Sequence, residues 1–279
     1  MMEFKQIRYE KDPETGIVLV TLNRPEIKNA LGIVLLLELY RAAEAVEMDE
    51  TASAMILTGA VSPEQTDPTQ EAFSSGMYLD FAELESLDEE TKQQVDLADL
   101  AQKRLCLKLW KIGKPVVAAI NGLAIGGGFT IPLACADLIY MSEHAWVKLP
   151  FVRLGLVPEL ASSYLLPRMI GFQRAKEIMF FGERLSAERL YNLGLINRVL
   201  PHGELLQFAR EQTCKLIPPQ GAGLAVRLSK EILHKPMIDA VSRALDLENE
   251  GLNRGFATSD FMEALNARME KRDPRFSGS

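Results

Sequence analysis

The sequence has few of the residues that build metal sites or disulfide frameworks. Its 279 residues include three cysteines and three histidines, with no CxxC pair and no histidine that has a cysteine or carboxylate at ligand spacing. Scattered cysteines in odd number are typical of small buried side chains in a reducing compartment. We therefore expect no metal site, and turn or surface positions for the histidines. These residues are Cys106, Cys135, Cys214, His144, His202 and His234.

Long apolar runs and an excess of positive charge are lacking too. No apolar stretch approaches the roughly 20 residues that cross a bilayer. Residues 1–6 contain no apolar signal core, and the final SGS is not a peroxisomal address. The 31 basic and 38 acidic side chains give a formal charge of −7, which disfavours a nucleic-acid binder. We expect a cytoplasmic protein without a membrane or nucleic-acid partner.

The patterning that is present is that of an α/β protein. Alternating strands and helices in the first half predict a mainly parallel sheet covered on both faces. Glu38, Arg41 and Glu44 are assigned to the solvent face of the helix over residues 31–48. Strands are predicted over residues 4–9, 17–22, 54–57, 116–120 and 138–141, and helical patterns over residues 31–48, 91–111 and 129–135.

The second half is predicted to be mainly helical. We expect residues 1–200 to form the core that carries the site, and residues 201–279 to form a helical region that joins subunits. The helices are predicted over residues 161–169, 174–181, 187–193, 203–216, 224–233 and 238–272.

Two turns rich in small residues each follow a predicted strand. The glycine triplet 126–128 opens a helix, so its backbone N–H groups can face outward at the positive helix end. The turn FSSGMY, residues 73–78, offers a second outward N–H at Met77. Each turn alone is also typical of an ordinary connection. Two such turns after parallel strands are what a two-donor oxyanion hole requires.

Glu159 has two interpretations. It follows Pro158, so it can be a first-turn carboxylate that complements a helix dipole behind an N1 proline. Alternatively, its apolar neighbours Val157, Leu160 and Ala161 remove water from the carboxylate and raise its pKa toward that of a general base.

Ordered motifs along nearly the whole chain resemble those of the enoyl-CoA hydratase/isomerase (crotonase) superfamily. The resemblance implies a spiral of ββα units with a helical C-terminal region, assembled as a trimer or a dimer of trimers. The motifs are TLNRP (21–25) with NAL (29–31), FSSG (73–76), KPVVAAING (114–122), GGG (126–128), ADL (136–138), LGLVPE (154–159) and EKRDPRF (270–276).

The resemblance also implies a substrate. This is an acyl-CoA thioester whose carbonyl oxygen lies between the N–H groups of Met77 and Gly127, with no separate cofactor because coenzyme A belongs to the substrate. The adenine and phosphates are expected near Lys28, Ala30 and the turn at residues 75–79. The full set of expected substrate contacts is Lys28, Ala30, Ser75, Gly76, Leu79, Gly126, Thr130 and Phe151, and Lys28 is equally compatible with a solvated lysine.

Two departures from the family pattern bear on the reaction. Family hydratases carry glutamates where Thr130 and Phe151 stand here, so water activation is not expected. The sequence is most similar in site pattern to 3,2-trans-enoyl-CoA isomerases of the peroxisomal type, which place one glutamate at the position of Glu159. The implied activity is a 3-enoyl to 2-enoyl shift in fatty-acid metabolism, with Glu159 as the lone acid/base.

Other functions remain open at this point. Tyr78 is similar to the turn residue of aromatic-acyl-CoA dehalogenases, but their nucleophile is an aspartate where Glu159 stands, and no histidine lies between that turn and the glycine triplet. Ring-opening isomerases of epoxy-phenylacetyl-CoA, other acyl-CoA lyases or hydrolases of the family, and a catalytically silent acyl-CoA-binding homologue are the alternatives.

Overall fold

Two β-sheets form the centre of the protein, as seen in the computed structural model, which describes residues 4–78, 81–85 and 87–279. The larger sheet has the order β1-β2-β3-β5-β7-β10 and is parallel except for β1 against β2. The smaller sheet has the order β4-β6-β8-β9 and is parallel except for β8 against β9. The strands are β1 Ile7–Lys11, β2 Ile17–Leu22, β3 Ala54–Gly59, β4 Ala72–Ser74, β5 Val116–Ile120, β6 Leu123–Ile125, β7 Leu138–Ser142, β8 Trp146–Lys148, β9 Leu185–Ser186 and β10 Arg198–Leu200.

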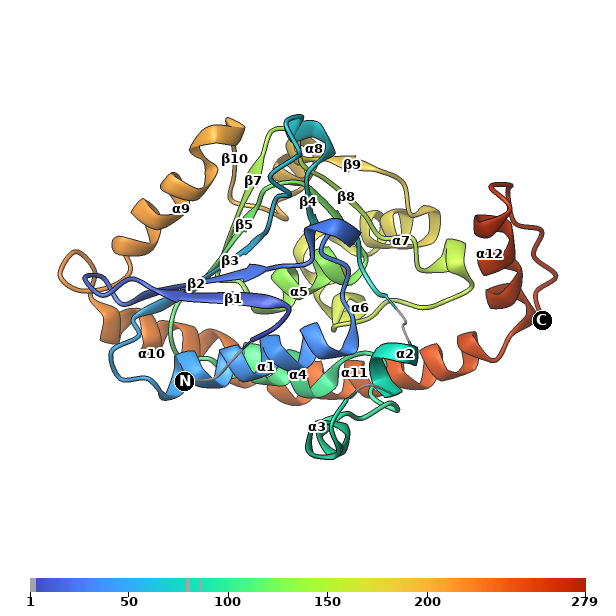
Figure 1. Cartoon of the computed structure of the whole chain (residues 1–279), viewed down its shortest axis with the longest axis horizontal. Coiled ribbons are helices and arrows are strands. Elements are labelled where there is room, and N and C mark those ends of the chain that lie inside the picture. The colour runs from blue at the N-terminus through green and yellow to red at the C-terminus, as the bar shows by residue number, and fades with distance from the viewer. Residues whose placement is uncertain (1–3, 79–80, 86) are drawn as a thin grey trace.

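Helices cover both faces of the larger sheet. Strand side chains alternate between faces, so Val18 and Val20 of β2 join the core under α1 and α4, whereas Ile17 and Leu19 pack toward α9. Figure 1 shows α9 on one side of this sheet and α1 and α4 on the other. The helices are α1 Ile33–Met48, α2 Phe81–Glu85, α3 Glu89–Gln94, α4 Lys103–Lys111, α5 Gly127–Cys135, α6 Ser162–Ile170, α7 Phe172–Phe181, α8 Ala187–Leu193, α9 Leu205–Cys214, α10 Gly223–His234, α11 Ile238–Phe256 and α12 Ser259–Met269.

Two long helices of the sequence prediction are wrong, and the reason is local capping. The pattern over residues 238–272 is interrupted after Phe256, because the Thr258 side chain accepts the N–H of Phe261 and starts α12. The pattern over residues 91–111 is divided into α3 and α4 by turns around Asp99, whose carboxylate accepts the N–H groups of Lys103 and Arg104. Among the described residues, no helix has the length and apolar character to cross a membrane.

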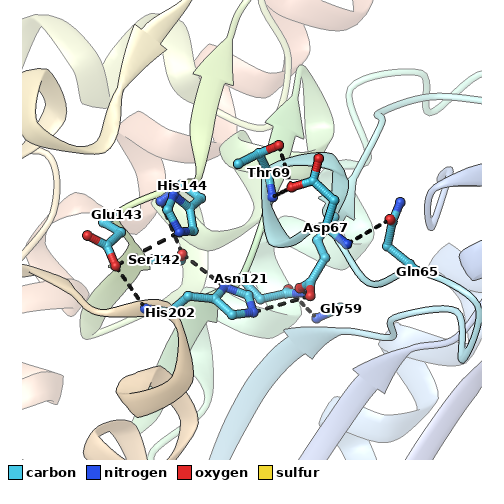
Figure 2. Close-up of polar contacts among 10 residues, drawn as sticks. Gly59, Gln65, Asp67, Thr69, Asn121, Ser142, Glu143, His144 and His202 are labelled. Atoms are coloured by element: carbon cyan, nitrogen blue, oxygen red, sulfur yellow. Dashed lines mark hydrogen bonds and ion pairs between the residues drawn. The ribbon is translucent and has the colours of Figure 1, made fainter.

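A polar cluster connects the two sheets at one edge. His202, which follows β10, lies 3.1 Å from Ser142 Oγ through Nδ1 and 3.2 Å from Glu71 Oε1 through Nε2. Asn121 links the same carboxylate to the backbone of Gly59 in β3. Figure 2 shows His202 pointing between β7 and the segment that leads into β4. The cluster holds the start of β4 in place. His202, expected at a turn or on the surface, therefore has structural partners in Ser142 and Glu71.

The expected solvent position of Glu38 in α1 is wrong. Its side chain is buried and accepts hydrogen bonds from the N–H groups of Lys5, Gln6 and Ile7, at 2.8, 2.8 and 3.1 Å. Three backbone donors replace water as the hydrogen-bond partners of this buried side chain. Glu38 thereby joins the start of β1 to α1.

We predict that Glu38→Ala lowers the free energy of unfolding by roughly 2–3 kcal/mol, because backbone donors that the carboxylate satisfies lose their partner. Denaturant unfolding measures this loss. The matched control is Glu44→Ala on the same helix, whose partly exposed pair with Lys108 is expected to contribute less than about 1 kcal/mol. Equal losses in both variants would contradict the assigned role of Glu38.

Candidate active site

The segment after β4 lies beside the segment before α1. Lys28 accepts the N–H of Ser75 through its carbonyl at 2.9 Å, and Leu31 pairs with the turn through Gly76 O and Tyr78 N. Asn29 is buried with φ 51° and donates from Nδ2 to the carbonyls of Ala60 and Ala72, each at 2.9 Å. The expected contact residues Lys28, Ala30, Ser75 and Gly76 are thus brought together, with Lys28 exposed and Ala30 buried.

The backbone of Met77 is oriented away from Leu31. In a parallel bridge the flanking residues supply the hydrogen bonds, so Gly76 O and Tyr78 N face Leu31 and the Met77 N–H faces the other way. Within residues that the structure describes, this N–H has no hydrogen-bond partner. Gly76 has φ +86°, and a β-carbon there would lie 2.6 Å from the carbonyl of Ile125. Glycine is therefore required for this turn to reach β6.

The glycine triplet brings the start of α5 against the same turn. A β-carbon on Gly128 would lie 2.6 Å from the carbonyl oxygen of Ser74 in β4. Gly127 is the first residue of α5, so its N–H has no partner within the helix. The turn that carries Met77 and the helix start that carries Gly127 are therefore neighbours in the structure. Their use as a pair of oxyanion donors stays a prediction.

The Glu159 carboxyl lies directly on this glycine turn. A β-carbon at Gly127 would be 3.1 Å from Glu159 Oε1, and one at Gly126 would be 3.8 Å from it. Glu159 is only 5% exposed, and Leu31, Leu160 and Phe151 border the glycines beside it. Burial, together with the negative charge of Glu248, raises the pKa of Glu159 to about 8, while the N–H of Gly127 acts in the opposite direction. The predicted desolvation of this carboxyl is confirmed.

The backbone after Glu159 is strained. Leu160 and Ala161 have φ of 54° and 60°, a left-handed conformation that is uncommon for residues with a β-carbon. The helix α6 begins only at Ser162, whose hydroxyl donates to the Glu159 carbonyl at 2.6 Å. Glu159 therefore precedes the helix, and its interpretation as a first-turn carboxylate is wrong. The strained turn directs its side chain into the interior instead.

A second buried carboxylate, Glu248 of α11, supports this turn. It accepts the N–H groups of Ala161 at 2.8 Å and Ser163 at 3.0 Å, and the Ser163 hydroxyl at 2.5 Å. Burial raises the pKa of Glu248 to about 7, although these hydrogen bonds act in the opposite direction. Sequence reasoning missed Glu248, since an acidic residue on a long amphipathic helix gives no local signal of burial.

The two positions where the family resemblance implies glutamates in hydratases contain no acid here. Thr130 is fully buried, and its hydroxyl donates to the Gly126 carbonyl at 3.3 Å. Phe151 is 5% exposed and its ring lies 3.7 Å from where a β-carbon of Gly126 would be. Neither side chain can accept a proton from water. The expected contact at Leu79 lies outside the described residues.

The Ser142–His202–Glu71 chain does not form a second active centre. Its order of contacts is that of a serine-hydrolase relay, but Ser142 is fully buried and its oxygen accepts the N–H of His144 at 3.2 Å. A nucleophile must reach its substrate. Among the described residues, no cluster of three potential metal ligands occurs either.

Comparison with known proteins assigns the chain to a family. The profile of the family described as Enoyl-CoA hydratase/isomerase matches residues 12–279. The chain belongs to this family. It is 32% identical over 272 residues to the short-chain-enoyl-CoA hydratase of Clostridium acetobutylicum, covering 97% of each chain. It is 29% identical over 287 residues to the 1,2-epoxyphenylacetyl-CoA isomerase of Escherichia coli, covering 100% of each.

A solved structure of the family shares the fold. The enoyl-CoA hydratase/isomerase from Pseudoalteromonas atlantica has a TM-score of 0.80 and 28% identity, covering 98% of this chain and 100% of that chain. The mixed α/β fold with its helical C-terminal part is therefore confirmed, as is the family resemblance read from the motifs. The division of the chain at residue 200 and the residue roles stay predictions.

We predict that Glu159→Gln stabilises the protein increasingly as pH rises from 5 to 8. The pKa of Glu159 is about 8 in the folded protein and near 4.5 when exposed, so folding takes up a proton between these values and wild-type stability falls as pH rises. Glutamine carries no charge, so Glu159→Gln avoids the cost of ionising a buried group. Its free energy of unfolding should exceed that of the wild type by a few kcal/mol at pH 8. Denaturant unfolding across this range measures it.

The control for that measurement is Glu64→Gln in an exposed loop, which should follow the wild type at every pH. A constant difference between Glu159→Gln and wild type from pH 5 to 8 would show that Glu159 is not desolvated.

Proposed function

We propose that this protein is an enoyl-CoA isomerase that moves a double bond from the 3 to the 2 position of an acyl-CoA thioester. The observation that carries the proposal is the buried carboxyl of Glu159 beside the N–H of Gly127, with no acid at Thr130 or Phe151. An allylic shift needs one base that takes up and returns a proton. Addition of water needs a group that activates water, and this site offers none at those two positions.

The reaction follows from these contacts in two proton transfers. The thioester oxygen binds between the N–H groups of Met77 and Gly127, and the Glu159 carboxylate removes a proton from C2. The electrons move into a dienolate, whose oxygen both donors stabilise. The protonated carboxyl then returns the proton at C4, which leaves the double bond between C2 and C3. A pKa near 8 suits both steps, since the group must accept and release the same proton near neutral pH.

The surroundings fit an acyl-CoA. A mostly apolar cavity of about 230 Å³ opens beside Met77 and Leu31, and residues of the segment after Thr91, such as Leu97 and Leu100, also line it. An acyl chain of C–H groups is held there by burial. Exposed Lys28 lies next to Ser75 at the mouth of the turn, where a phosphate of coenzyme A is expected.

Assembly into a trimer, or a dimer of trimers, belongs to this proposal. Leu224, Leu228 and Ile232 form an exposed stripe at helical spacing on α10, with 71%, 48% and 71% of their surfaces accessible. Such a stripe on a soluble helix favours a protein interface. The exposed stripe lies in the helical region that was expected to join subunits.

The second candidate is a ring-type isomerase. The Escherichia coli relative named 1,2-epoxyphenylacetyl-CoA isomerase matches the whole chain, and a cavity lined by Tyr78 and Phe256 also accepts an aromatic acyl group. We place it second because the family resemblance implies that ring-opening isomerases of this kind carry an aspartate, one methylene shorter, where Glu159 stands here.

We predict that Glu159→Gln reduces kcat for conversion of 3-enoyl-CoA to 2-enoyl-CoA by about a thousandfold, since it removes the proton carrier but keeps the shape. The conjugated product is followed by its ultraviolet absorbance. Glu64→Gln serves as the control and should retain full activity. Equal rates for wild type and Glu159→Gln would end the isomerase proposal.

A second test concerns water addition. Several relatives are named as hydratases, yet Thr130 and Phe151 provide no base, so hydration of 2-enoyl-CoA should be negligible beside isomerisation of 3-enoyl-CoA. Loss of the enoyl absorbance with formation of 3-hydroxyacyl-CoA, measured on the same preparation, decides the point. Hydration as fast as isomerisation would overturn the substitution argument.

A further inference from the structure

One face of α11 lies against the segment that carries Glu159. A β-carbon at Gly251 would be 2.8 Å from Val157 Cγ2, and one at Gly255 would be 3.0 Å from the carbonyl of Gly155. Glu248, Gly251 and Gly255 have spacings of three and four residues, which places them on one helix face. Two glycines therefore allow α11 to approach residues 155–157 closely. The carboxylate of Glu248, one helical turn earlier, reaches the start of α6.

Glu248 holds the strained part of this segment. Its three hydrogen bonds go to Ala161 and Ser163, the first being a residue with positive φ. Left-handed backbone at residues with a β-carbon persists only where surrounding contacts enforce it. Because Glu159 directly precedes Leu160 and Ala161, the direction of its side chain depends on the contacts that keep this turn in place.

Two buried carboxyls so close in the fold also affect each other's charge. Negative charge on Glu248 disfavours ionisation of Glu159. Burial raises the pKa of Glu248 itself to about 7, and hydrogen bonds from Ser163 and Ala161 limit that rise by favouring its charged form. Glu248 accepts three hydrogen bonds, whereas Glu159 has only the N–H of Gly127 to stabilise its charged form. Glu248 therefore ionises more easily than Glu159. The pair therefore tends to hold one charge, on Glu248, while Glu159 stays protonated over a wider pH range.

We propose that Glu248 is a positioning residue, which anchors the Glu159 turn to α11 and couples the charge of the proposed base to that of a second buried carboxyl. The inference rests on the proposed function, and it adds a determinant of the pH range in which the site works. Glu248 does not contact the reacting atoms in this account. It acts through residues 160–163 and through its charge.

The other charged or titratable groups around Glu248 do not replace this role. Cys106 of α4 faces it, and burial together with the charges of Glu248 and Asp99 raises the pKa of that thiol, so it remains neutral. Asp99 is held by Asn249, and Asp246 pairs with Lys103 at the outer side of α11. The ionisable groups that respond to removal of the Glu248 charge are therefore Glu159 first and Cys106 second.

The test is a pH titration of Glu248→Gln with two readouts. Infrared difference spectroscopy of the full-length protein follows the protonated carboxyl band that Glu159→Gln abolishes, and needs no substrate. The kcat/KM for 3-enoyl-CoA follows the ionisation of the base through activity. In Glu248→Gln both inflections should move to lower pH by about one pH unit, and kcat should fall about tenfold from loss of the turn's anchor.

The controls separate charge from structure. Glu250→Gln, an exposed carboxylate on the same helix, should match the wild type, and Glu248→Asp should keep the wild-type inflection because it keeps the charge. If Glu248→Gln does not fold, Ser163→Ala gives the same test: loss of the donating hydroxyl raises the pKa of Glu248, and the Glu159 inflection again moves down.

Unchanged infrared inflections in Glu248→Gln, or in Ser163→Ala where the first variant does not fold, would overturn the coupling. A wild type without isomerase activity would refute the proposed function instead, and the infrared titration would still decide whether the two carboxyls interact.

Discussion

An ionisable group with almost no access to water is the constraint on which the rest of the site depends. Glu159 is 5% exposed, so its charge is disfavoured unless the protein supplies partners. One backbone N–H, from Gly127, is directed at it, and a second carboxylate opposes its ionisation. The result is a carboxyl that exchanges its proton near neutral pH, at some loss of folding stability.

The surrounding architecture makes this environment from backbone rather than from polar side chains. Glycines at 76 and 128 let the turn after β4, the strand β6 and the start of α5 approach to distances that a β-carbon would prevent. This close approach places the N–H of Met77, which has no partner among the described residues, near that of Gly127, which is directed at Glu159. The helix α11 packs against residues 155–157, which lead to Glu159, because Gly251 and Gly255 leave room for this contact. The backbone donors are thus positioned by β4, β6 and α5, and the segment of the base is positioned by α11.

The sequence predicted the features that local chemistry determines. The glycine triplet, the Met77 turn and the apolar surroundings of Glu159 could all be identified, because each is written in consecutive residues. The burial of Glu38 and Glu248 could not, since each carboxylate is satisfied by backbone groups 31 or more residues away. The left-handed conformation of Leu160 and Ala161 was missed for the same reason, because distant contacts enforce it.

The direct test of a single proton carrier is to follow the proton itself. 3-Enoyl-CoA that carries deuterium at C2 is converted by the protein in ordinary water, and the product is analysed for deuterium at C4. Transfer by one buried carboxyl predicts that a substantial fraction of the label moves from C2 to C4, because water has little access to Glu159 during the reaction. Complete loss of the label to solvent, with full isomerase activity, would contradict the account.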